Sequence, residues 1–472
     1  MEKKNCTPIL VALSALLFIS VIVIVVLSLS CEKSNKESHE SYHSAANNLS
    51  LQSLDKAALK RLINGAPKTD LHLHIESGTN PQLAFRIAQR NNVVLGSSAW
   101  PWKTPDDLIK ALDFKDLESF LLIFYAVSAA IQKPIDFQEQ AENVVNTLIA
   151  NNVVHAEIFF DPQTFTSRNI SFKTVADNFN IGLDRGRALG LSVRLIMSVL
   201  RDSPVGKSSD TGSCLAGFPD MAHSTGWSAV KQTVDYNKQT ANPMWKIIGI
   251  GLDSNEVPYP PELFSDIYQY AGQNGLFKTA HCGEEGPAAY VWTGIRETQY
   301  GGLGLARIDH GVHCGDDKNL CSYLASPVNT SGVMAAYGEP HKIPITFCPM
   351  SNYRLKVFPD PSTINIAPLL NLGVMCCVNV DDPMYTGDQN AKEMPSKWVN
   401  ASWELLIDSC METSKRIPLT FGNLKELLVN GFEASWLSRY QKMQYITKLN
   451  EYFNQNTPSL FDYLSPQVKV GF

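Results

Sequence analysis

Apolar, strand-like runs alternate with longer amphipathic stretches along most of this 472-residue chain, and this order restricts the possible folds more than any other feature. It is typical of parallel strands joined by helical crossovers. No Gly-rich phosphate loop supports an open sheet, whereas eight strands suit a closed barrel, so the sequence predicts an α/β fold of the TIM-type (β/α)8 barrel class. The candidate strands lie near residues 69–74, 153–160, 193–200, 246–252, 277–281, 307–310, 344–348 and 374–380.

The N-terminal end differs from the rest of the chain because residues 8–30 form an almost unbroken apolar run, long enough to cross a bilayer. Residues 1–31 are therefore predicted to be a signal anchor or, since Cys31 follows small residues, a lipoprotein-like signal segment. Both interpretations stay open, because Ser28 departs from the lipoprotein pattern. Charge bias should keep the N-terminal lysines in the cytoplasm. We therefore expect an exported body that is attached to the membrane through this segment.

A polar, acidic stretch rich in Ser and Asn, residues 32–53, is predicted to be a linker, and residues 54–472 are predicted to form one barrel domain. The hydrophobic content of 44% suffices for a large core. The net charge of −6 argues against a nucleic-acid partner. Residues 202–226 are rich in Ser, Gly and Asp and are expected to form a surface insertion near the barrel mouth.

The ten cysteines do not have the placement of a dense disulfide framework. Several of them fall in strand-like apolar runs, where a free buried thiol is the usual state. Cys314 and Cys321 are the pair that proximity in the sequence favours for a disulfide, although spacing alone does not fix its geometry.

Two histidines alternate with apolar residues in the first candidate strand, at His72 and His74. Alternate residues of a strand point to the same face, so both imidazoles can reach one metal ion. Three later segments place polar residues at the ends of apolar runs: 281–286 (His-Cys-Gly-Glu-Glu-Gly), 307–311 (Arg-Ile-Asp-His-Gly) and 379–383 (Asn-Val-Asp-Asp-Pro). In a barrel of this kind the active site lies at the C-terminal ends of the strands, so these segments should meet there.

Three imidazoles and one carboxylate make up the predicted metal site, a donor set that suits a borderline divalent ion such as Zn²⁺. We expect one ion per chain, bound by four ligands with a further position open to water, which favours hydrolytic chemistry. The predicted ligands are His72, His74, His281 and Asp381.

Three further side chains at the same rim are candidates for proton transfer. Glu284 follows His281 by three residues and is expected to act as a general acid over the barrel mouth. His310 and Asp382 could orient the hydroxide and take its proton. The last two also have structural alternatives: His310 precedes Gly311 as in a turn, and Asp382 precedes Pro383 as at a helix start.

These motifs resemble the adenosine and adenine deaminases of the amidohydrolase superfamily. The resemblance extends from residues 67–72 (Pro-Lys-Thr-Asp-Leu-His) through residues 430–435 (Asn-Gly-Phe-Glu-Ala-Ser). It implies that the four predicted ligands bind zinc and that Glu284 protonates a 6-aminopurine at N1. It also implies that His310 and Asp382 handle the attacking hydroxide and ring N7. The expected reaction adds hydroxide at C6 and releases ammonia.

The substrate is expected to be free adenine rather than adenosine or 2′-deoxyadenosine, which remain the alternative. Glu76 stands where the adenosine type carries an Asp that resembles a ribose contact, and its longer side chain would reach into the space for the sugar. Residues 253–256 (Asp-Ser-Asn-Glu) resemble the adenine type, with Ser254 in place of a Gly near purine N3. Residues 156–164 resemble the adenine type as well. Glu76, Asp253, Ser254 and Asp382 are therefore the predicted substrate-binding residues.

Other classes remain to be weighed against a deaminase. An inactive homologue that serves as a binding or growth-factor-like protein is disfavoured because every predicted ligand and Glu284 are present. Other His-x-His hydrolases commonly use a Lys at the end of the fourth strand, whereas Lys246 stands at its start. The cytidine-deaminase signature is absent.

A lid is expected between the first two strands. Its candidates are Trp100, Trp102, Phe114, Leu117, Phe120 and Leu121.

Overall fold

The computed structural model describes residues 47–201, 218–257, 259–328, 341–386, 398–412 and 419–461. The predicted N-terminal segment, residues 1–31, lies outside these ranges, as does most of the predicted linker. Within the described part of the chain, no helix combines the length and the apolar character that a membrane span requires.

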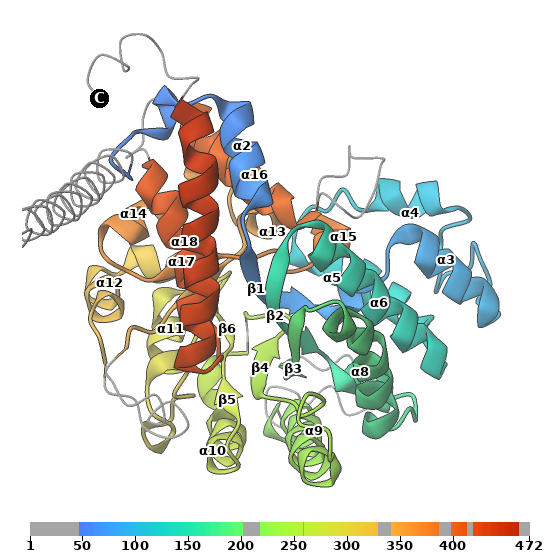
Figure 1. Cartoon of the computed structure of the whole chain (residues 1–472). Helices are drawn as coiled ribbons and strands as arrows, with labels where there is room; N and C mark the ends of the chain where they lie inside the picture. The colour runs from blue at the N-terminus through green and yellow to red at the C-terminus, as the bar shows by residue number, and fades with distance from the viewer. Residues whose placement is uncertain are drawn as a thin grey trace, which may run out of the picture.

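The strands form two parallel sheets with helices outside them (Figure 1). The α/β class with parallel sheets is therefore confirmed. The first sheet contains β1 (Lys68–His74), β2 (Val153–Phe160), β3 (Ser192–Leu200), β4 (Gly249–Asp253) and β5 (Phe277–Lys278). The second contains β6 (His281–Cys282), β7 (Ile308–His310), β8 (Ile345–Phe347) and β9 (Cys376–Val378).

Backbone hydrogen bonds join the two sheets at both edges. At one edge β5 runs on into β6, and between them the Thr279 amide donates to the Ile250 carbonyl of β4 (3.0 Å). At the other edge the His74 amide donates to the Asp381 carbonyl (3.1 Å), and the Asp381 amide donates to the His72 carbonyl (2.8 Å). The parallel strands thus follow one another around a ring, the order that the sequence predicted for a barrel.

Two strands differ from the prediction. The fourth begins at Gly249, not at Lys246, because the Asn237 side chain forms hydrogen bonds with both backbone polar groups of Ile247. Asn237 Nδ2 donates to the Ile247 carbonyl (2.7 Å), and Asn237 Oδ1 accepts from the Ile247 amide (2.9 Å). The fifth is divided into β5 and β6 because its first half pairs with β4 and its second half with β7. The remaining predicted strands agree with the structure to within two residues at either end.

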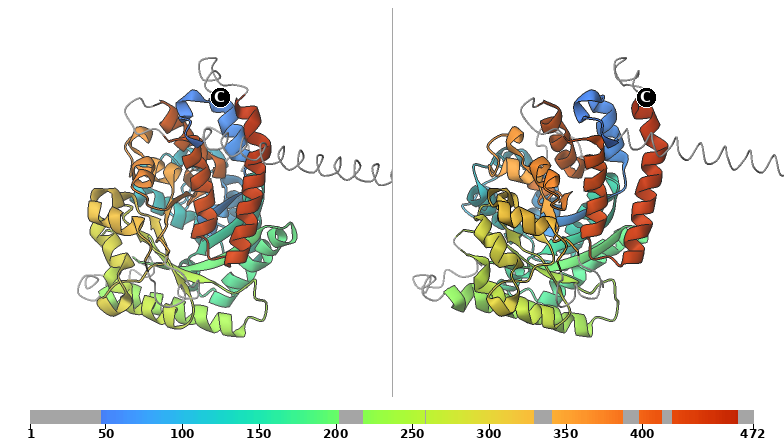
Figure 2. Two further views of the ribbon diagram at one scale, coloured as in Figure 1. Left: turned by 60° about the vertical axis from the view of Figure 1, so that its left-hand side comes forward. Right: turned by 90° about the vertical axis from the view of Figure 1, so that its left-hand side faces the viewer.

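Helices cover the outside of the strands, and the C-terminal pair α17 and α18 lies beside α2 (Figures 1 and 2). The Tyr452 hydroxyl of α18 donates to the Leu62 carbonyl of α2 (2.8 Å), which ties the two ends of the domain together. The helices are α2 (Lys56–Gly65), α3 (Pro81–Arg90), α4 (Pro105–Ala111), α5 (Leu117–Ala129), α6 (Pro134–Ala150), α7 (Pro162–Thr166), α8 (Phe172–Ala188), α9 (Phe218–Gln239), α10 (Ser265–Gln273), α11 (Ala288–Ile295), α12 (Lys318–Ala325), α13 (Pro349–Arg354), α14 (Ile366–Asn371), α15 (Pro383–Thr386), α16 (Trp398–Glu412), α17 (Phe421–Ala434) and α18 (Arg439–Phe461).

Three sequence expectations need correction. The packed body begins before residue 54, since Ser50 pairs with Thr420 and Leu51 is fully buried. Residues 218–226 of the predicted insertion begin α9, and residues 202–217 lie outside the described part. The predicted disulfide is wrong: Cys314 and Cys321 are both free, and the Cys321 thiol donates to the Cys314 carbonyl (3.1 Å).

Candidate active site

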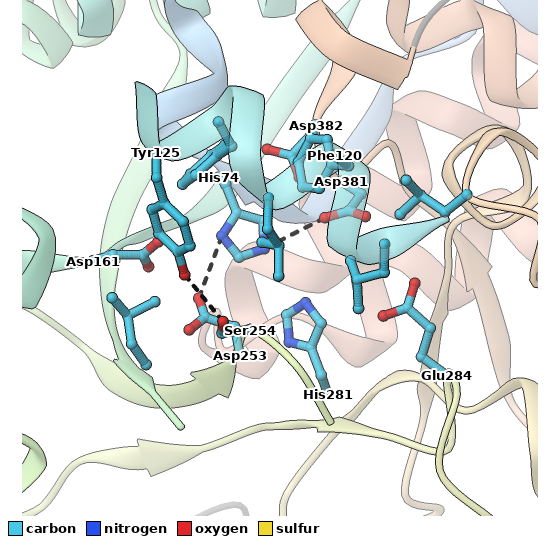
Figure 3. A pocket seen from close by; sticks show the side chains of 15 residues that line it. His74, Phe120, Tyr125, Asp161, Asp253, Ser254, His281, Glu284, Asp381 and Asp382 are labelled. Atoms are coloured by element: carbon cyan, nitrogen blue, oxygen red, sulfur yellow. Dashed lines mark hydrogen bonds and ion pairs between the residues drawn. The ribbon is translucent and has the colours of Figure 1, made fainter. Parts of the chain in front are cut away.

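Side chains from the C-terminal ends of the strands surround a cavity of about 440 Å³, including its open mouth (Figure 3). The strand ends converge because all the strands run in the same direction around the ring. Seven of the residues predicted from the sequence line this cavity: His74, Asp253, Ser254, His281, Glu284, Asp381 and Asp382. The prediction that separate strand ends form one site therefore agrees with the structure.

Imidazole and carboxylate groups converge at the base of this cavity. The His72 and His281 Nε2 atoms lie 3.2 Å apart, and His72 Nε2 lies 3.5 Å from Asp381 Oδ1. His74 Nε2 lies 3.4 Å from the same carboxylate oxygen. One ligand atom each from His72, His281, His310 and Asp381 falls within 4.8 Å of the others, while His74 forms a second such group with Glu76 and Asp161.

Hydrogen bonds behind His72 determine which ring nitrogen faces the cavity. Thr346 Oγ1 donates to Asp309 Oδ1 (2.8 Å), so this hydroxyl must accept from His72 Nδ1, which lies 3.0 Å away. Nδ1 therefore carries a proton, and Nε2 is the atom that a metal ion could bind once it displaces the proton there. Burial alone would lower the pKa of His72, but the hydrogen bond to Asp381 and the charges of the nearby carboxylates raise it, so without a metal the charged ring is favoured. A hydrogen-bonded second nitrogen of this kind is the usual support of a metal-binding histidine.

His310 has the opposite arrangement. The Asn352 amide nitrogen lies 3.0 Å from His310 Nδ1 and donates to it, while also donating to Glu284 Oε1 (3.1 Å). Burial, followed by the charge of His72, lowers the pKa of His310 to about 3, so the ring is neutral and carries its proton on Nε2. Nε2 therefore carries a hydrogen that it can donate; it lies 3.8 Å from Asp381 Oδ2 and has no hydrogen-bond partner among the described residues. This favours the predicted division, in which His310 orients a reactant and does not bind the metal.

The donors fit a single divalent ion. Asp381 keeps its charge: burial alone would raise its pKa, but the hydrogen bond from His72 and the charges of three histidines hold it well below the usual value. Ser351 Oγ donates to Asp381 Oδ2 (2.6 Å) and fixes that carboxylate. His281 Nδ1 is buried and has no protein partner among the described residues. Imidazoles and an ionised carboxylate that converge in this way are the donor set of catalytic zinc sites.

Glu284 is held by a single carboxylate behind its loop. The Glu256 side chain accepts the backbone amides of Gly283 (2.7 Å), Glu284 (3.0 Å), Glu285 (3.0 Å) and Gly286 (2.9 Å). Burial, then the charge of Asp381, raises the pKa of Glu284 well above its usual value. The protonated form of Glu284 is thus favoured, and it can serve as an acid.

Three residues of the site have left-handed backbone conformations that non-glycine residues rarely adopt. Their φ angles are 71° at Ser254, 63° at His310 and 65° at Asp381. Such conformations cost about 1–3 kcal/mol each and persist where the surrounding structure imposes them, often at functional sites. The strain coincides here with side chains that the sequence singled out.

Glu76 does not take the position that the sequence suggested. It is 1% exposed and is not among the residues that line the cavity. Its Oε1 atom accepts the backbone amide of Asp161 (2.9 Å), and Asp161 does line the cavity. Glu76 thus supports a neighbouring carboxylate from behind.

Half of the residues predicted to form a lid line the cavity. Leu117, Phe120 and Leu121 of α5 line the cavity, and Phe124 and Tyr125 of the same helix join them. The Tyr125 hydroxyl lies 3.0 Å from Ser254 Oγ across the mouth (Figure 3). The other three candidates, Trp100, Trp102 and Phe114, are buried in the core and do not reach the cavity.

Sequence reasoning missed several of these residues. Ser351 and Asn352 lie in α13, which follows β8, and neither carries a spacing that could have identified it. Asp161 follows β2 and falls within residues 156–164, which resembled the adenine type, but no role was assigned to it. Tyr125 lies on a helix and carried no signal.

A parallel α/β ring with imidazoles and carboxylates at one rim defines a hydrolase of the amidohydrolase type. A family model described as adenosine deaminase matches residues 67–452, and the chain belongs to this family. Adenine deaminase from Wolinella succinogenes is 34% identical over 392 residues, 83% of this chain and 99% of that protein. Adenine deaminase from Geotalea uraniireducens is 36% identical over 389 residues, 82% of this chain and 91% of that protein.

Solved structures agree with this assignment. The crystal structure of adenine deaminase from Arthrobacter aurescens matches with a TM-score of 0.66 and 29% identity, covering 83% of this chain and all of that one. An amidohydrolase from Burkhoderia ambifaria with bound zinc has a TM-score of 0.65 at 23% identity, over 86% of this chain and 95% of that chain. At that identity the second comparison shows the fold alone.

Proposed function

We propose that this protein hydrolyses free adenine at C6 to give hypoxanthine and ammonia, using one zinc ion. The observation that carries the proposal is the pairing, across one cavity, of a protonated buried acid, Glu284, with the imidazole and carboxylate donors around Asp381. The family and its adenine-specific relatives support the same reaction.

The metal would be held by the four residues that the sequence nominated: His72, His74, His281 and Asp381. When bound, zinc supplies Lewis-acid activation of a water molecule at neutral pH. His74 belongs to this set because its Nε2 approaches the same Asp381 oxygen that faces His72.

The protein's own side chains move the protons. Glu284 gives its proton to purine N1, which makes C6 electrophilic. His310, with its proton on Nε2, orients the attacking oxygen as this oxygen bonds to C6. One proton of the attacking water passes to the amino group, which leaves as ammonia, and the other returns to Glu284, while the water oxygen remains as the 6-oxo group. Asp382 lines the same cavity, and burial, followed by the charge of Asp381, raises the pKa of Asp382, so its protonated carboxyl can donate a hydrogen bond to ring N7.

The lid excludes bulk water from this centre. Leu117, Phe120, Leu121 and Phe124 bring one apolar face of α5 over the cavity. Exclusion of water strengthens the electrostatic interactions inside and prevents the acid from losing its proton to solvent. The base therefore reacts in an apolar slot with polar groups at its two ends.

The N-terminal segment suggests where the reaction takes place. We propose that the catalytic domain is exported and remains attached to the membrane, because an apolar run of spanning length precedes it. Cell fractionation of the full chain tests this: release by carbonate washing, or recovery of the intact chain in the cytosol, would contradict it. Substitution of Cys31 by Ser should abolish attachment only if this cysteine is acylated.

The reaction itself is tested by kcat/KM for adenine, adenosine and 2′-deoxyadenosine on the zinc-loaded full chain, followed by loss of the 6-aminopurine absorbance. We expect adenine to be preferred by at least about tenfold, which corresponds to about 1.4 kcal/mol in the transition state. Preference for the nucleosides would keep the mechanism and overturn the substrate. No turnover of any of the three by the metal-loaded chain would overturn the enzymatic proposal.

A further inference from the structure

Two carboxylates form a polar end of the cavity that the mechanism above does not use. Asp161, at the end of β2, and Asp253, at the end of β4, lie across the cavity from Glu284 (Figure 3). They are 2% and 3% exposed. Asp161 Oδ1 and both Asp253 oxygens have no partner at normal hydrogen-bond distance among the described residues, although Asp253 Oδ2 lies 3.6 Å from His74 Nδ1 and the two carboxyl groups interact with each other. Buried acceptors without a donor cost free energy, so their retention beside a cavity indicates that a bound molecule supplies the donor.

Asp161 is held rigidly in this position. Its backbone amide donates to Glu76 Oε1 (2.9 Å), and the Glu76 carbonyl accepts from Gln140 Nε2 (3.0 Å). Pro162 follows at the first position of α7 and limits the backbone on the other side. The Asp161 backbone is therefore restrained on both sides, and its carboxyl group belongs to the lining of the cavity.

A free purine base and its nucleoside differ at one hydrogen-bonding position. The five-membered ring of the base carries an N–H, and in the nucleoside a carbon of the sugar replaces that hydrogen. This N–H lies on the edge of the purine opposite N1 and C6. When N1 faces Glu284, the N–H edge faces the opposite end of the cavity, where Asp161 lies.

We propose that the Asp161 carboxylate accepts the imidazole N–H of the free base, and that this contact separates bases from nucleosides. The inference rests on the proposed adenine deamination and assigns its specificity to a residue other than Glu76. A site built to bond a substrate N–H rejects the analogue that lacks it, by up to roughly 10⁴–10⁵-fold. Glu76 is then a positioning residue that acts through the Asp161 backbone.

The first test needs no variant. 9-Methyladenine keeps the reacting half of adenine and lacks the ring N–H in question. We expect the wild-type enzyme to favour adenine over 9-methyladenine in kcat/KM by at least about tenfold, the effect of leaving a buried hydrogen-bonding group without its partner. Ratios below about threefold would overturn the inference while leaving adenine deamination established. A wild-type enzyme that does not turn over adenine would instead overturn the proposed function.

The second test separates the hydrogen bond from steric exclusion. Asp161→Ala should lower kcat/KM for adenine by about 30- to 100-fold, change the value for 9-methyladenine by less than about threefold, and keep its zinc. Asp235→Ala, at an exposed carboxylate of α9, is the matched control and should leave both values unchanged. Equal losses on both substrates would show that Asp161 is only structural.

Two further readouts complete the test. Glu76→Gln keeps an oxygen that can accept the Asp161 amide and should retain the adenine preference, whereas Glu76→Ala should lose part of it. Metal analysis should give one zinc per chain in the wild type and in Asp161→Ala. Two metal ions in the wild type and one in Asp161→Ala would show that these carboxylates bind a second cation, which would overturn the inference.

Discussion

Two groups of buried carboxylates in this domain have opposite electrostatic environments. Glu157, inside the barrel on β2, accepts from Arg307 Nη1 (2.5 Å) and from the Trp436 amide (2.5 Å), and lies 3.2 Å from His155 Nε2. Burial alone would raise its pKa, but the Arg307 charge overrides this and lowers it to about 2. At the rim, the pKa of Glu284 is raised by burial and by the negative charges around it.

The comparison shows how one fold uses charge for two purposes. Glu157 is paired with a guanidinium that also stacks on the Trp436 ring, 4.2 Å from its centroid, so it helps to fix how α17 and the following residues close over the strands. The rim keeps Glu284 neutral and Asp382 partly unpaired, which costs stability and leaves groups free for a reactant. We therefore expect changes in the two groups to have different consequences.

The largest effect is expected at Glu284. Glu284→Gln keeps the shape and the acceptor for Asn352 but removes the transferable proton, so kcat should fall by about 10²–10⁴-fold. Zinc content should be unchanged, as measured by metal analysis of the same sample. Glu285→Gln, at the next carboxylate, which is exposed, is the matched control, and its kcat should stay within about threefold of the wild type. Loss of zinc together with activity in Glu284→Gln would contradict the acid role.

The next effect concerns stability. Removing one partner of a buried ion pair costs about 3–5 kcal/mol, so Glu157→Gln should lower the free energy of unfolding by about that amount in urea titrations. Turnover per folded molecule should be unchanged. The exposed pair of Glu142 and Arg185 offers the control, because Glu142→Gln should cost less than about 1 kcal/mol. A similar loss of unfolding free energy in both variants would show that the buried pair stabilises the domain no more than the exposed pair.

The pH dependence of the same variant sharpens the comparison. The pKa of Glu157 is lowered in the folded state to about 2, from a usual value near 4.5. Its contribution to stability is therefore complete above about pH 4.5 and is lost as the pH falls toward 2. The difference in unfolding free energy between the wild type and Glu157→Gln should shrink across that window. If this difference stayed constant across the pH range, the charge of Glu157 would not contribute to stability.

A smaller effect on turnover is expected from the carboxylate behind the Glu284 loop. Glu256→Ala leaves four backbone amides without their acceptor and lets Glu284 shift, and a displacement of about 1 Å can cost about 10²-fold. We expect kcat to fall by about 10–100-fold with KM changed less than threefold and zinc retained. A change in KM alone would indicate that Glu256 binds substrate and does not position the acid.

The smallest effect is expected at Ser351, whose hydroxyl donates to Asp381. Ser351→Ala should weaken zinc binding by about tenfold, the lower range for a residue that supports a metal ligand. Activity at saturating zinc should remain near that of the wild type. Competition with a chelator measures the affinity, and an unchanged affinity would show that Asp381 is fixed without this bond.

The sequence could predict the order of strands and the residues at their ends, because parallel strands carry a strong apolar pattern and their C-terminal ends must meet. Residues 72, 281 and 381 could therefore be grouped although they are far apart in the chain. The direction of the Glu76 side chain could not be predicted, since it depends on the short 3-10 turn Ile75–Gly78 and on the Asp161 amide.

Other features depend on contacts that leave no local pattern. Asn352 donates to two catalytic groups from α13, and a single amide in a helix carries no distinctive spacing. The fourth strand was predicted to begin early because the apolar residues 247 and 248 resemble a strand. In the structure, the Asn237 side chain forms hydrogen bonds with the backbone amide and carbonyl of Ile247. Two nearby cysteines suggested a disulfide, but burial of both thiols as free groups became evident only from the packing.

The central claim is that the rim carboxyls serve reaction at the expense of stability, while Glu157 serves stability. The most direct test is the unfolding free energy of Glu284→Gln compared with the wild type at equal zinc content. We predict that the variant is at least as stable as the wild type, despite its loss of turnover. A destabilisation as large as that of Glu157→Gln would contradict the account.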